Sequence, residues 1–201
     1  MTDIYGGIPM KKLIAALLIV CLLLSVSGCS MIAFIVGENA ETEKYLKLTT
    51  DELAALSDEE LLTTLHKRTE YAANTQWNLG EGVAKLPEAQ RVFYVLYCFQ
   101  QDNANGGLCR FFVNNSRNPA PKVSDALGIL GAEEHKALFD SFVTKNEIDV
   151  TYLIYFIISN ESEFAEQRNR YPFDDFDIPY GELPSLKDML VVYAREHIAE
   201  F

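Results

Sequence analysis

The chain has 201 residues, 29 of them acidic and 17 basic, which gives a formal net charge of −12 at pH 7. A chain this acidic is repelled by nucleic acid and by anionic lipid head groups, which argues against direct DNA or RNA binding. If charge steers its partners, those partners are basic.

The N-terminal region has the pattern of a bacterial lipoprotein signal peptide. Lys11 and Lys12 precede an apolar run that ends in three small residues before Cys29. This combination is typical of signals that are cut before the cysteine, whose thiol carries a diacylglyceryl chain. We therefore expect residues 1–28 to be the signal, with Met10 as the true start, and Cys29 to be the lipidation site.

An uncleaved membrane helix is the alternative for the same region. The sequence stays apolar beyond Cys29, and the stretch from Leu13 to Val36 is long enough to cross a bilayer. Lysines before this stretch and glutamates after it place the following residues outside the cytoplasm by the positive-inside rule. The small residues before Cys29 favour a lipid anchor, and either anchor puts the domain in the bacterial cell envelope.

Four cysteines occur in the sequence, and two of them belong to the folded part. Cys21 leaves with the signal and Cys29 is acylated, so only Cys98 and Cys109 remain. An oxidising compartment permits a disulfide between them. Alternatively, both cysteines are small buried hydrophobic residues beside aromatic side chains. Two cysteines alone do not show the regular spacing that identifies a disulfide-rich domain.

The chain after the signal divides into a tether and one folded domain. We expect residues 29–49 to be the tether, which turns polar and acidic from Gly37, and residues 50–201 to be the domain. Ser57 and Glu60 form a capping box, which predicts the start of a helix. The two glycines of residues 80–82 predict a loop.

The strongest helical pattern covers residues 88–101, where apolar side chains recur at i, i+4 and i+7 over a wide stripe. We expect this helix to be central in the core and to end at the Asn- and Gly-rich residues 103–107. A short apolar element follows at 108–113. Helices are then predicted over 120–130 and 132–144, divided by Gly131.

Residues 148–158 are β-branched and aromatic, which suits a strand, but no second run offers such a strand a partner. Because a lone strand leaves its hydrogen bonds open, we predict a buried helix that continues toward Arg168. The last helix is predicted over 185–199. The fold class expected from the whole pattern is therefore a compact all-α domain.

The segment 103–115 combines asparagine, glycine, arginine and aromatic residues. The favoured interpretation is a turn in which glycines take positive φ and asparagine side chains cap the next helix. The alternative is a polar pocket for a small ligand. Its residues would be Asn105, Gly106, Gly107, Arg110 and Asn114.

A second constellation, residues 171–182, interleaves carboxylates with aromatic rings. The spacing does not fit a calcium loop. In the simpler interpretation the rings dock a loop on the core and the carboxylates stay solvated. In the functional one, a basic partner recognises an acidic surface made of Asp174, Asp175, Asp177 and Glu182.

Catalytic, cofactor and metal motifs are not recognisable in this sequence. His66, His135 and His197 fall on three separate predicted helices, and none has a histidine or cysteine at i+3 or i+4. There is no nucleophile elbow, phosphate-binding loop or dinucleotide fingerprint. We therefore expect no metal, no cofactor and no enzymatic activity.

Several of these segments together carry a family resemblance. Residues about 55–200 resemble the DNA-mimic-protein-19-like domain family, also known as domain of unknown function 4375. The resemblance rests on an aromatic helix, an Asn-Gly-Gly turn, an aromatic pair followed by asparagines, and a Leu-Gly-Ala-like step. These are residues 91–97, 105–107, 111–115 and 125–132. Residues 173–177 and 190–193 also look similar.

The resemblance implies a mostly helical fold without known catalytic activity. The family's namesake is an acidic dimer that mimics DNA and occupies the DNA-binding face of a transcription factor, so the resemblance also implies a homodimer. An anchor outside the cytoplasm excludes a cytoplasmic repressor as partner. The leading hypothesis is a membrane-anchored domain that binds a basic protein. The alternatives are a small-ligand site or enzyme at the Asn-Gly-Gly turn, and a cytoplasmic DNA mimic.

Overall fold

In the computed structural model, which describes residues 43–74 and 79–201, every regular element is a helix. The all-α prediction is therefore confirmed for the described part of the chain. The expected signal, Cys29 and the tether up to residue 42 lie outside the described residues. Within the described ranges, no helix is both long enough and apolar enough to span a bilayer.

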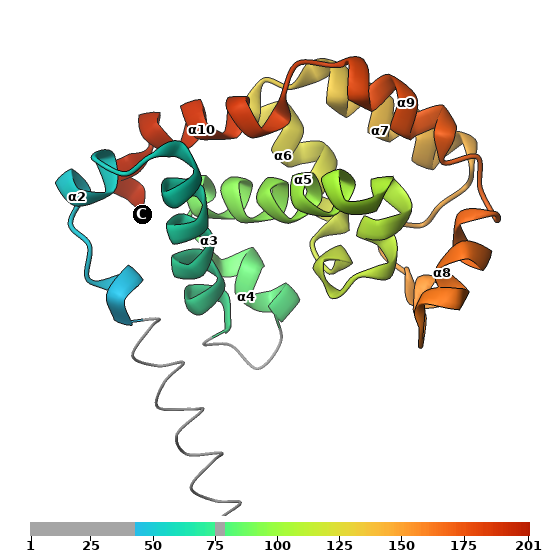
Figure 1. The fold of residues 1–201 in the computed structure, drawn as a ribbon, viewed down its shortest axis with the longest axis horizontal. Helices are drawn as coiled ribbons and strands as arrows, with labels where there is room; N and C mark the ends of the chain where they lie inside the picture. The colour runs from blue at the N-terminus through green and yellow to red at the C-terminus, as the bar shows by residue number, and fades with distance from the viewer. Residues whose placement is uncertain (1–42, 75–78) are drawn as a thin grey trace, which may run out of the picture. The chain divides into compact units, whose positions relative to one another are not determined.

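Residues Tyr45–Phe201 form one compact unit (Figure 1). Its α-helices are α2 Thr50–Ala54, α3 Asp58–Asn74, α4 Leu79–Lys85, α5 Glu88–Val113, α6 Val123–Leu130, α7 Glu133–Lys145, α8 Glu161–Arg168, α9 Asp174–Glu182 and α10 Leu186–Glu196. Short 3₁₀ turns are η1 Asn115–Arg117, η2 Ala120–Lys122, η3 Ile154–Phe156 and η4 Ile198–Glu200.

Helix α5 is the centre of the unit, as its wide apolar stripe predicts. It packs against α3, α4, α6, α8, α9 and α10, and Figure 1 shows it running through the middle of the ribbon. Val92, Leu96 and Phe99 on this helix are at most 1% exposed. Phe99 meets Phe111 and Phe139 edge-on, with ring centroids 5.2 and 5.6 Å apart, the geometry that aromatic pairs prefer.

Helix α3 begins where the capping box predicts. The Glu60 amide donates to Ser57 Oγ over 3.4 Å, and the Ser57 amide donates to the Glu60 carboxylate over 3.2 Å. The loop predicted at residues 80–82 is wrong, because these residues belong to α4. A Cβ on Gly82 would lie 2.0 Å from the Ala73 carbonyl oxygen, so this glycine permits close packing of α4 on α3.

The predicted break at residues 103–107 is a kink inside α5 rather than an end of the helix. Gly106 and Gly107 leave the helical conformation there, and Gly107 has φ 73°. This left-handed region of φ disfavours residues with a Cβ. The helix resumes at once and continues to Val113, which accounts for the short apolar element predicted at 108–113.

Gly131 divides α6 from α7, as predicted. It has φ 78° and ends α6 in a left-handed cap, and its amide donates back into the last turn. The predicted C-terminal helix is α10 followed by the turn η4. Leu186, Leu190 and Tyr193 are buried on α10, whereas His197 beyond its end is half-buried.

The buried helix predicted from residue 148 toward Arg168 is wrong. Residues 148–158 form turns and the short η3, and α8 begins only at Glu161. Asn160 causes this start, because its extended backbone breaks any preceding helix while its side chain accepts from the Ser162 and Glu163 amides. Ile148, Leu153 and Phe156 are buried and hold the segment on the core.

Candidate functional site

The Asp177 carboxylate reaches the kink of α5 from α9. One oxygen accepts the Leu108 amide over 2.8 Å, and the other accepts Arg168 over 2.7 Å. The first amide of a resumed helix has no partner within that helix, so Asp177 acts there as its N-cap. The turn interpretation of the Asn-Gly-Gly segment predicted asparagines as caps, but at Leu108 the cap is an aspartate from the acidic tract.

The other carboxylates of the predicted acidic surface are largely paired within the domain. Arg168 also holds Asp174, over 2.7 Å, and Lys145 holds Asp175 over 2.9 Å. Glu182 is exposed and makes no ion pair with the described residues. Of the four predicted residues, Glu182 is therefore the one whose charge stays fully available to a partner.

The polar residues that follow the kink have partners of different kinds. Arg110 holds both oxygens of Glu161, over 2.9 and 3.1 Å, and its guanidinium lies 3.9 Å from the centre of the Phe164 ring. The hydrogen bond from Arg110 lowers the pKa of the Glu161 carboxyl. Arg110 thus fixes α8 to α5 through a bidentate pair and a cation–π contact.

Asn114 and Asn105 do not join Arg110 in a pocket among the described residues. The Asn114 side chain donates to Asp102 over 2.6 Å, and Ser116 also donates to Asp102. Burial raises the pKa of the Asp102 carboxyl, while these two hydrogen bonds act in the opposite direction. Asn105 is exposed. The contacts of Asn114 and Ser116 with Asp102 therefore tie the end of α5 to the turn that follows it.

Both cysteines of the domain are free thiols, so the disulfide alternative is not realised. They lie on α5 on either side of the kink, and α5 advances about 1.5 Å per residue, which carries them beyond disulfide range. His66 Nε2 lies 3.9 Å from Cys98 Sγ. Burial raises the pKa of Cys98 to about 12 and that of Cys109 to about 11, which keeps both thiols protonated near neutral pH.

A small hollow lies between the α6–α7 turn and the α9–α10 turn. Its volume is about 230 Å³, and we name it the acidic hollow. The residues that line it are Gly131, Ala132, Glu133, Glu134, His135, Pro184 and Met189. Glu133 and Glu134 are exposed, and Glu182 ends α9 two residues before Pro184.

His135 forms a buried part of the wall of the acidic hollow. His135 is 3% exposed, and it contacts Tyr180 edge-on with ring centroids 5.5 Å apart. Burial lowers the pKa of His135, although a hydrogen bond to the Pro184 backbone opposes this shift. His135 is therefore neutral near pH 7, and the charges at the hollow are the carboxylates of its two glutamates.

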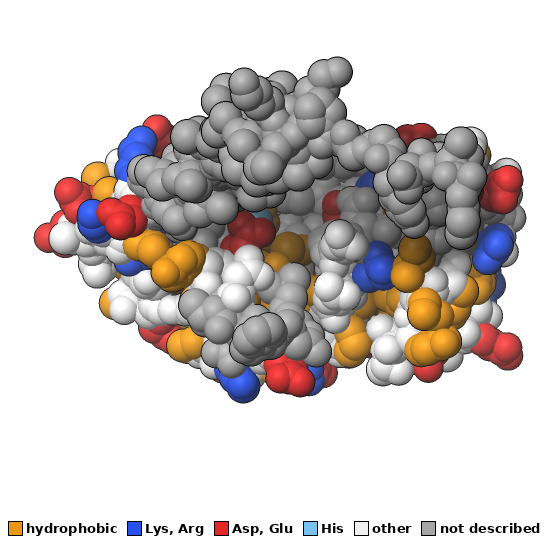
Figure 2. Space-filling view, turned by 90° about the horizontal axis from the view of Figure 1, so that it is seen from below, with side chains coloured by type: hydrophobic (Ala, Val, Ile, Leu, Met, Phe, Trp, Pro, Cys, Tyr) orange, Lys and Arg blue, Asp and Glu red, His pale blue; other side chains and the backbone are white. Residues whose placement is uncertain are grey.

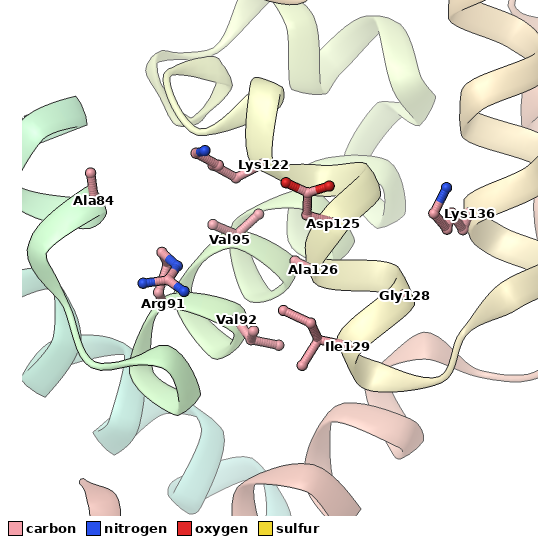
Figure 3. A pocket seen from close by; sticks show the side chains of 10 residues that line it. All are labelled: Ala84, Arg91, Val92, Val95, Lys122, Asp125, Ala126, Gly128, Ile129 and Lys136. Carbon is pink, nitrogen blue, oxygen red and sulfur yellow. The ribbon is translucent and has the colours of Figure 1, made fainter.

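A larger hollow of about 620 Å³ lies over α4, α5, α6 and α7 (Figure 3). We name it the basic groove, because Arg91, Lys122 and Lys136 line it and Asp125 is the one acidic residue among its described lining residues. Its apolar lining includes Val92, Val95, Ala126 and Ile129. Nothing in the sequence pattern pointed to this groove, since its three basic residues come from separate helices and turns.

No group of three or more histidine, cysteine, aspartate or glutamate side chains suited to a metal ion occurs in the described residues. A model of the family described as DMP19-like protein matches residues 84–197.

The chain belongs to the DMP19-like family. The match includes the kink of α5, the acidic hollow and the basic groove, whereas α2 and α3 precede it. No curated protein and no solved structure gives a significant match to the chain.

Proposed function

We propose that this DMP19-like chain is a non-catalytic binding domain that recognises a basic protein and is carried on a lipid anchor in the bacterial cell envelope. The net charge of −12 supports a basic partner. The lipoprotein pattern that ends at Cys29 supports the anchor and its orientation. The observation that carries the recognition step is the acidic hollow.

The shape and charge of the acidic hollow suit one basic side chain of a partner. An arginine or lysine has an apolar stem and a charged head, and such side chains bury the stem while the head stays near water or an anion. Pro184 and Met189 offer the stem an apolar wall, and Glu133 and Glu134 offer the head carboxylates. Opposite charges placed in this way give specificity and speed of association.

Mimicry of a long stretch of DNA is the runner-up, and the charge distribution favours it less. A duplex presents one sign of charge along its whole length. On the face seen in Figure 2, the described acidic, basic and apolar side chains are interspersed instead of forming one acidic field. The internal pairing of Asp174, Asp175 and Asp177 further reduces the acidic surface open to a partner.

The test is affinity capture of envelope proteins by the full-length anchored chain, with mass spectrometry of what is retained. The variant reverses the two carboxylates that line the acidic hollow, Glu133→Lys and Glu134→Lys, together with Glu182→Lys, two residues before Pro184. All three side chains are exposed, so the fold should survive. We expect a basic partner captured by the native chain to be lost from this variant.

A matched control reverses three exposed glutamates elsewhere on the domain, Glu81, Glu166 and Glu196. It changes the net charge by the same amount and should retain the partner. Equal loss from both variants would mean that only overall charge matters. Retention by the hollow variant would contradict the assignment of the acidic hollow.

A further inference from the structure

The basic groove combines an aliphatic surface with positive charge on a strongly acidic chain. Val92, Val95 and Ala126 form buried walls, and Ile129 stands 46% exposed beside them. Figure 3 shows Arg91, Lys122 and Lys136 arranged around these apolar side chains. Small-molecule sites are typically concave, mostly apolar and provided with a few polar or charged groups, as this groove is.

The three basic side chains differ in how strongly the protein already holds them. Lys136 pairs with Asp140 over 2.6 Å, which raises its pKa. Arg91 donates to the Leu86 carbonyl oxygen over 3.2 Å and lies 3.7 Å from a Glu88 carboxylate oxygen.

Lys122 is exposed and makes no ion pair with the described residues, so its charge is free to meet a ligand. Lys122 and Arg91 are therefore the groups that an incoming anion would contact first.

The volume of the groove favours a small ligand over a protein surface. Binding sites for small molecules are typically about 300–1,000 Å³, a range that includes this groove. A stable protein interface needs roughly 800 Å² from each partner and so extends well beyond a single groove. The positive charges of the groove favour an anionic ligand, and its aliphatic lining favours a ligand that also has an apolar part.

We propose that the basic groove binds a small organic anion, namely a carboxylate that carries a short aliphatic chain. The carboxylate lies between Lys122 and Arg91, and the aliphatic chain packs on Val92, Val95 and Ile129. This site is separate from the acidic hollow and does not depend on the protein partner proposed above.

Saturation-transfer NMR can test the proposal with hexanoate as the probe. The full chain is held in lipid nanodiscs, and empty nanodiscs provide the blank. We expect saturable hexanoate binding, with acetate and 1-hexanol each binding at least about tenfold more weakly, because each lacks one of the two recognised parts.

Variants locate the binding within the groove. Lys122→Glu should weaken hexanoate binding about tenfold through charge reversal, and Ile129→Gln about fivefold through loss of apolar contact. Asp125→Asn should strengthen binding, since it removes a carboxylate from the lining of the groove. Arg170→Glu and Ile178→Gln are matched controls, because both side chains are exposed and lie outside the groove lining.

Three results would overturn the proposal. These are no saturable hexanoate binding to the native chain, equal binding of hexanoate and 1-hexanol, or unchanged hexanoate binding in both groove variants. If hexanoate fails to bind while Lys122→Glu and Ile129→Gln dissociate a dimer in ultracentrifugation, the groove belongs to a second copy of the chain. Circular dichroism of each variant separates these results from misfolding.

Discussion

Asp177 has a role in the structure that differs from the role its sequence context suggests. In the sequence it is one of several carboxylates in an acidic tract that suits a recognition surface. In the structure its side chain is only 17% exposed, and it joins α9 to the kink of α5 and to Arg168. The carboxylate therefore has a structural role that its sequence neighbours do not reveal.

Replacement of Asp177 by alanine should lower the free energy of unfolding by about 1–3 kcal/mol, because it uncaps Leu108 and removes a charged partner of Arg168. Urea denaturation measures the change. Asp174→Ala is the matched control, since Asp174 pairs with the same arginine but is exposed, and its loss should be below about 1 kcal/mol. Equal losses for the two variants would contradict a capping role for Asp177.

At the scale of elements, local patterns predicted α3, α5, α6, α7 and α10, but they did not predict α2 or α9 as helices. The stripe on α5, the capping box at Ser57 and the glycine at 131 are signals contained within a few residues, and the structure confirms all three. The segment 148–158 was predicted wrongly because its apolar side chains suited either a strand or a helix. The competing signal was the N-cap at Asn160, which starts a new helix.

Gly107 and Gly131, the described glycines in the left-handed region of φ, allow the cost of backbone strain to be separated from the cost of steric crowding. Gly131→Ala adds a Cβ that meets nothing within 4 Å, so we expect a loss of about 1 kcal/mol from strain alone. A Cβ on Gly107 would lie 2.2 Å from an Asp177 oxygen, so Gly107→Ala should also displace the cap and lose about 2–4 kcal/mol.

Thermal unfolding of both variants measures this difference. In an Asp177→Ala background the two glycine variants should become nearly equal, because the crowding at position 107 has been removed. If Gly107→Ala still destabilises the protein much more than Gly131→Ala in that background, a contact other than the Asp177 carboxylate causes the crowding at position 107.

At the scale of the whole molecule, the sequence does not predict which residues come together in the acidic hollow and in the basic groove. Glu134 and Met189 meet at the acidic hollow from α7 and α10, and Arg91 and Lys136 meet at the basic groove from α5 and α7. These residues are separated by dozens of positions, so only tertiary packing brings them together. Of the residues that the sequence analysis singled out, Glu182 lies two positions before Pro184 of the acidic hollow, whereas the lining glutamates Glu133 and Glu134 were not predicted as a site.

The lipid anchor that we propose is a property of the whole molecule, and labelling with an alkyne analogue of a fatty acid tests it. We expect the native chain in a bacterial host to be labelled and to lose residues 10–28, because a lipoprotein signal is cut before the acylated cysteine. Cys29→Ala should abolish both effects, whereas Cys21→Ala, a cysteine within the apolar stretch, should preserve them. An unlabelled chain whose intact mass retains residues 10–28 would favour the uncleaved membrane helix. By the positive-inside rule, an uncleaved helix also places the acidic domain outside the cytoplasm. The capture experiment therefore tests for an envelope partner with either kind of anchor.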